Sequence, residues 1–131
     1  MDNTPSTVLA IKLMSTIPDY TPEELKAISD CLQERYGENV PFEQADIELR
    51  LSENDSQVTE CPAVYWEKNS CHFIIAKTDE VQYFSQFFYG AQEQFGTGKR
   101  FYNDLLECVL TTLRVQADHD LQRNKAKELN T

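Results

Sequence analysis

The sequence lacks any apolar run long enough to cross a membrane. The apolar residues 8–11 are followed at once by Lys12, whereas a membrane-spanning helix needs about 20 consecutive apolar residues. Residues 1–5 also lack the basic region of a secretory signal. We therefore expect a cytosolic protein that does not bind a membrane.

The chain also lacks the cysteine spacing of a metal or redox site. The four cysteines are Cys31, Cys61, Cys71 and Cys108. None of them forms the C-x-x-C pair that zinc knuckles and thioredoxin-type centres use. A metal site built from Cys61, Cys71, His72 and His119 has no supporting spacing. We therefore expect no metal and no cofactor, and cysteines that are buried as small apolar side chains.

No phosphate-binding loop is present either. Residues 96–100 read Gly-Thr-Gly-Lys-Arg, but a P-loop needs a glycine at position 93 and a Ser or Thr after Lys99. The sequence has Glu93 and Arg100 at those positions. The two basic residues are therefore expected to be solvated in an ordinary loop.

Positive charge is scarce in the middle of the chain. Residues 19–94 contain 16 acidic and 5 basic side chains, a net charge of −11, whereas the whole sequence carries −10. Lys and Arg are absent from residues 78–98, where aromatic residues are densest. A field of one sign repels polyanions and attracts cationic surfaces. We expect no direct binding to nucleic acid and a basic protein partner.

Local signals predict one well-defined helix near the start. Thr21, Pro22 and Glu24 form a capping-box start, and Gly37 is a natural stop. The apolar side chains between them recur every three or four residues, as on one face of a helix. A weaker helix is predicted around residues 6–16.

Strand patterns follow. Residues 46–51 alternate between charged and apolar side chains, as in a half-buried strand. Residues 63–66 and 71–76 flank a short polar turn and predict a β-hairpin whose second strand is buried on both faces. Residues 78–95 fit either a helix or a fourth strand, and we favour the strand because three strands make a thin sheet.

A long helix is predicted from about Lys99. Its stripe is Tyr102, Leu106, Val109 or Leu110, Leu113, Ala117 and Leu121. Leu105 and Cys108 widen the apolar arc beyond what one sheet face needs. We therefore expect part of this helix to pack against a second subunit, as a homodimer.

The predicted fold class is α+β, with an antiparallel three- or four-stranded sheet packed by an N-terminal helix and a long C-terminal helix. Residues 1–20 form an N-terminal segment that includes the weaker helix. Residues 21–121 form a single domain. Residues 122–131 carry no apolar stripe and are expected to be a polar, fraying tail.

In size, acidity and element order the chain is similar to small acidic secretion chaperones and to toxin-neutralising immunity proteins. This similarity of architecture carries no residue across. The leading hypothesis is a non-enzymatic cytosolic protein-binding module of adaptor, chaperone or inhibitor type. Its expected partner-binding residues are Glu48, Glu53, Phe87, Phe88 and Tyr89.

Two alternatives stay open. One is an acidic mimic of nucleic acid that blocks a DNA- or RNA-binding protein. The other is a small enzyme that uses Cys71 or His72, although neighbours on a strand point to opposite faces and cannot form a catalytic pair.

Overall fold

The computed structural model describes residues 17–54 and 56–129. The order of elements is α2 (Pro22–Tyr36), β1 (Glu43–Leu49), β2 (Thr59–Lys68), β3 (Cys71–Asp79), β4 (Gln82–Phe88), β5 (Gln94–Phe95) and α3 (Leu105–Leu129). This arrangement confirms the α+β class, but the sheet has five strands where three or four were predicted. The weaker helix predicted over residues 6–16 lies outside the described residues.

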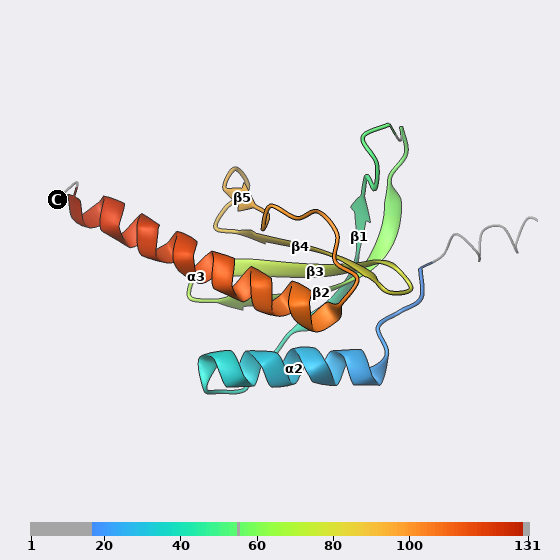
Figure 1. Cartoon of the computed structure of the whole chain (residues 1–131), viewed down its shortest axis with the longest axis horizontal. Helices are drawn as coiled ribbons and strands as arrows, with labels where there is room; N and C mark the ends of the chain where they lie inside the picture. Colours follow the sequence, from blue (N-terminus) through green and yellow to red (C-terminus); the bar gives the residue numbers. More distant parts are fainter. Residues whose placement is uncertain (1–16, 55, 130–131) are drawn as a thin grey trace, which may run out of the picture.

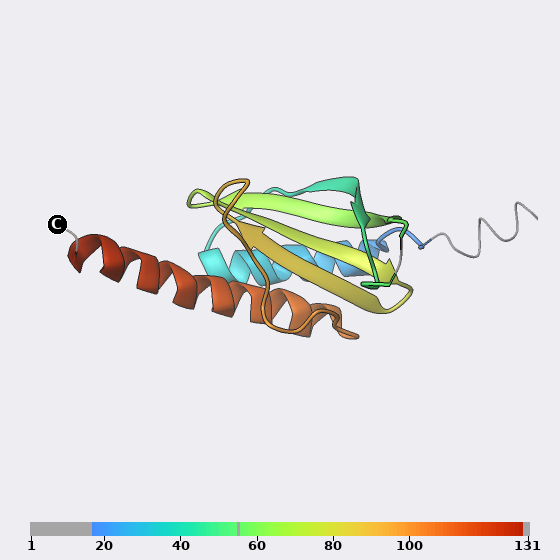
Figure 2. The same ribbon diagram turned by 90° about the horizontal axis from the view of Figure 1, so that it is seen from above.

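The strands form an antiparallel meander in the order β1-β2-β3-β4-β5, and both helices pack on one face of it (Figure 1, Figure 2). Trp66, Phe73 and Phe87 are aligned across the central strands and point toward the helices. On each strand, the residues directly before and after this aromatic residue point to the opposite side of the sheet, which we call the outer face.

Helix α2 forms as its local sequence predicts. The Thr21 hydroxyl accepts a hydrogen bond from the Glu24 N–H, and the Glu24 carboxylate accepts one from the Thr21 N–H. Gly37 ends the helix in the left-handed conformation, at φ 72°, which costs glycine little because it has no Cβ.

The predicted hairpin is also present. Strands β2 and β3 are joined by Asn69 and Ser70, both at positive φ, as a two-residue turn with the twist of the strands requires. Residues 82–88 are a strand, as favoured. Strand β5 was not predicted, because two residues are too few to show a periodic pattern.

Helix α3 begins later and ends later than predicted. Tyr102 is not helical, because its backbone N–H and C=O pair with those of Tyr83 at 2.8 and 2.7 Å. Asp104 then accepts the Glu107 N–H at 3.0 Å and caps a helix that starts at Leu105. The helix continues to Leu129, so residues 122–129 are helical where a fraying tail was predicted.

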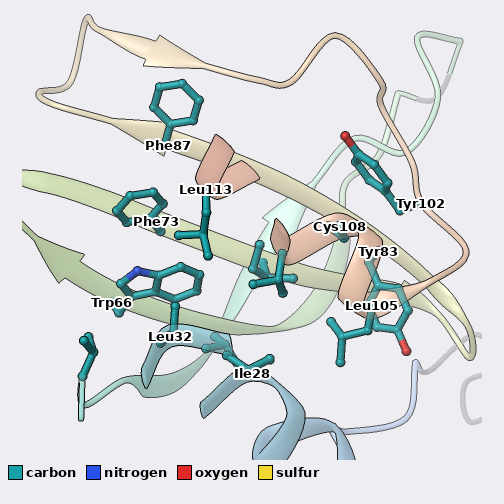
Figure 3. Packing of buried hydrophobic residues seen from close by; sticks show 14 of the residues in the cluster. Ile28, Leu32, Trp66, Phe73, Tyr83, Phe87, Tyr102, Leu105, Cys108 and Leu113 are labelled. Carbon is teal, nitrogen blue, oxygen red and sulfur yellow. The ribbon is translucent and has the colours of Figure 1, made fainter. Parts of the chain in front are cut away.

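The predicted stripe of α3 meets the core only in part, through Val109 and Leu113. The core-facing residues of α3 are Leu105, Cys108, Val109, Thr112 and Leu113, of which Figure 3 labels Leu105, Cys108 and Leu113. Leu106, Leu110 and Leu121 are exposed. The core-facing stripe is therefore rotated by about one residue, or 100°, from the predicted one.

Candidate functional site

The structure separates the five predicted partner-binding residues. Glu48 is exposed on the edge strand β1, in register with Glu60. Glu53 follows β1 and lines a hollow of about 410 Å³ with Phe84 and Arg100. The three aromatic residues lie at the far end of β4, where successive side chains point to alternate faces. The five residues therefore form no single patch.

Phe87 is a core residue, and its assignment to a partner surface is wrong. Its side chain is 0% exposed and packs against Phe95 and His119 and against Phe73, which Figure 3 labels beside it. A ring without solvent exposure cannot contact a partner unless the core opens.

Tyr89 is half-buried and ties α3 to the sheet. The Arg123 guanidinium lies 3.9 Å from the Tyr89 ring centroid, and the Tyr89 hydroxyl accepts a hydrogen bond from Gln116 at 3.2 Å. Its ring stacks with His119 at 5.7 Å. Tyr89 is thus engaged inside the protein.

Phe88 lies on the outer face and belongs to a row of stacked rings. Its ring is 4.9 Å from His72 at an angle of 12°, and His72 is 5.9 Å from Tyr65 at 18°. The Tyr65 hydroxyl and His72 Nδ1 are 2.6 Å apart and share a hydrogen bond. We call Tyr65, His72 and Phe88 the aromatic ladder. All three side chains are half-buried, and neither helix covers this face.

Carboxylates surround the ladder. Glu67 is in register with His72, and its Oε1 lies 4.0 Å from His72 Nδ1. Glu43 is in register with Tyr65 at the sheet edge. Burial, and then the charges of Glu67 and Glu43, raise the pKa of Tyr65 above its ordinary value. The ladder is therefore a stack of aromatic rings, with their faces turned toward one another, in a negative field.

The other end of the outer face is closed by a small second core. Ile17, Cys61, Ala63 and Ala76 are buried there against half-buried apolar side chains from β1, β3 and β4. The ladder end of the outer face leaves half-buried aromatic rings beside Glu43 and Glu67.

The two candidate catalytic residues lie on opposite faces, as strand geometry requires. Cys71 is buried in the helix-side core, and burial raises the pKa of its thiol to about 11. His72 is part of the outer-face ladder. His119 is near Phe87 on the helix side. Over residues 17–54 and 56–129, no three His, Cys, Asp or Glu side chains are placed to hold a metal ion.

Lys99 and Arg100 do not open a helix, because α3 starts at Leu105. Lys99 Nζ is 3.5 Å from Glu107 and stands over the Tyr102 ring. Arg100 donates a hydrogen bond to the Arg50 carbonyl and lies near the Phe84 ring. Both side chains have partners within the protein.

Three members of this site, Tyr65, Glu67 and Glu43, were not predicted from the sequence, and His72 was considered only for catalysis. The sequence contained one signal that could have placed Glu67 beside His72. A two-residue turn at Asn69 and Ser70 places Glu67 opposite His72 and puts both on the same face. The further alignment with Phe88 needed the register of β3 with β4.

No family model, no curated protein and no solved structure matches this chain. In the part of the chain that the structure describes, neither helix has the length and apolar character to cross a bilayer.

Proposed function

We propose that the protein is a non-enzymatic, cytosolic protein-binding module that recognises a basic partner through the aromatic ladder. The observation that supports this most directly is the stack of Tyr65, His72 and Phe88 beside the carboxylates of Glu43 and Glu67. A guanidinium group stacks well on an aromatic face and pairs with carboxylates in its plane. The partner's contacting side chain is therefore an arginine.

The charge of the whole chain supports the same partner. The net charge of −10 steers a cationic protein toward the surface and repels nucleic acid. Stacking then holds the complex, at about 0.5–2 kcal/mol for each cation on a ring. The two contributions can be measured separately, because steering acts on association and packing acts on dissociation.

The test begins with capture from the source cell and identification of the bound protein by crosslinking and mass spectrometry. Full-length wild type is compared with Phe88→Ala and Glu67→Lys. We expect both variants to lose the partner. Glu80→Lys changes the same charge at an exposed position outside the ladder, and Val81→Ala truncates an exposed apolar side chain. Both controls should retain the partner.

Kinetics of the captured protein then separate the two effects. Glu67→Lys should lower the association rate constant about tenfold at low salt, and added salt should reduce the difference. Phe88→Ala should raise the dissociation rate constant about tenfold. A short arginine-containing peptide should bind more tightly than its lysine counterpart. An acidic partner, salt-independent association or equal binding of the two peptides would contradict the proposal.

A further inference from the structure

Helix α3 has a second apolar stripe that the protein itself leaves uncovered. Leu106, Leu110, Ala117 and Leu121 lie within about 60° of one another around the helix axis, and we call them the outer stripe. The three leucines are 45%, 52% and 61% exposed. The core-facing stripe lies beside it and is fully used by the sheet and α2. The packing of a single chain therefore does not use the outer stripe.

A groove between α2 and α3 borders the outer stripe. Its volume is about 460 Å³, and Leu110, Ala117 and the half-buried Cys31 supply its apolar lining. Figure 2 shows α3 continuing past the end of the sheet, so its last turns are not covered by strands. Groove and stripe together form one continuous face along the helix.

The charges at this face differ from those of the rest of the protein. The groove is flanked by Glu34, Arg35, Arg114 and Asp118, two of each sign. Within residues 17–54 and 56–129, none of these four forms an ion pair. The face is thus locally neutral on a chain of net charge −10. Each helix contributes one acidic and one basic group to this face. The charges of the face can therefore pair with those of a second, identical face.

We propose that the outer stripe and the α2/α3 groove form the interface of a homodimer related by a twofold axis. A second copy is the occupant that matches this face in both charge and shape, because an isologous interface must be self-complementary. With the axis near residue 116 and the two α3 helices antiparallel, Arg114 faces the partner subunit's Asp118, and the pair occurs twice. In the same register Leu110 packs close to the partner subunit's Leu121.

Helix α3 is long enough to form such an interface. Its 25 residues span about 37 Å at 1.5 Å per residue. Leu106 and Leu121 are four turns apart, so the stripe supplies apolar contacts at both ends of the crossing. The interface lies on the helix side of the sheet and leaves the aromatic ladder accessible, so the dimer is bivalent for the proposed partner.

The mass in solution tests this proposal. Sedimentation and light scattering of the full chain at micromolar concentration should report twice 15.1 kDa. Leu110→Asp should yield the single-chain mass, with a dissociation constant raised at least about tenfold. Circular dichroism should show that it stays folded, because Leu110 is exposed in the protomer. Val81→Asp also replaces an exposed apolar side chain by aspartate, at a 64% exposed position outside α3. This control variant should keep the dimer mass.

A charge exchange tests the orientation of the two helices. Arg114→Glu or Asp118→Arg alone should place like charges together and weaken the dimer at least about tenfold. The double variant restores opposite charges across the axis and should recover the dimer. Cys31, the one half-buried cysteine, should be alkylated faster in Leu110→Asp than in wild type. A wild-type chain of single mass, or a dimer that survives Leu110→Asp, would overturn the proposal.

Discussion

Replacing Glu24 by alanine is expected to lower the free energy of unfolding by about 3–5 kcal/mol. The Lys77 side chain is only 3% exposed, and its Nζ lies 2.8 Å from Glu24 Oε1. Lys77 also donates to the Asp19 carbonyl at 3.2 Å, and the Tyr83 hydroxyl donates to Glu24. Removing the carboxylate leaves a buried cation without its counter-ion. Denaturant unfolding followed by Trp66 fluorescence measures the loss.

The matched control is the exposed pair of Lys26 and Asp30 on the same helix, 2.8 Å apart. Lys26→Ala should lower the free energy of unfolding far less than Glu24→Ala does, because solvent screens exposed i,i+4 pairs. Replacing both buried partners, as Glu24→Leu with Lys77→Met, should recover much of the stability lost in Glu24→Ala. If Glu24→Ala and Lys26→Ala lowered the free energy of unfolding equally, the buried pair would contribute no more to stability than the exposed pair.

Acid should weaken the wild type through the same carboxylate. Burial alone would raise the pKa of Glu24, but hydrogen bonds from Lys77, Tyr83 and the Thr21 N–H outweigh it and hold the pKa below the ordinary 4.5. A lowered folded-state pKa stabilises the protein above the unfolded pKa. This stabilisation is lost as the pH falls below about 4.5 and through the folded-state pKa. The double variant should show a smaller loss of stability over that range.

Phe87→Ala is expected to cost about 3–5 kcal/mol as well, by leaving a cavity in the core. The Phe87 ring lies 5.7 Å from Phe95, 5.7 Å from His119 and 6.4 Å from Phe73. Its loss loosens β4, β5 and the middle of α3 together. Chemical denaturation should show a lower midpoint with little change in slope.

The adjacent residue is the control for this prediction. Phe88 has the same side chain but lies half-buried on the outer face, so Phe88→Ala should cost less than about 2 kcal/mol. The two variants should also separate in binding, since only Phe88 belongs to the aromatic ladder. If Phe88→Ala proved the more destabilising, the assignment of inner and outer faces in β4 would be wrong.

The sequence by itself determined the elements that local chemistry controls. The capping box at Thr21 and Glu24, the stop at Gly37 and the polar hairpin turn predicted within residues 68–70 each depend on a few neighbouring residues. Alternation in residues 46–51 indicated the strand that the structure places at Glu43–Leu49, whereas residues 78–95 fitted either a helix or a strand, of which the strand was favoured. These features can be recognised in a sequence because helix caps, turns and strand alternation depend on residues that are close together in the chain.

Only the tertiary structure decided which surfaces meet. Helix α3 carries two adjacent apolar stripes, and periodicity cannot say which one faces the sheet. Its start moved to Leu105 because Tyr102 pairs with Tyr83, a contact that sequence spacing does not reveal. The burial of Lys77 and the stacking of His72 with Phe88 likewise depend on strand register and on helix α2. Such contacts join residues far apart in the chain, so they are determined by packing of the whole core and not by local preference.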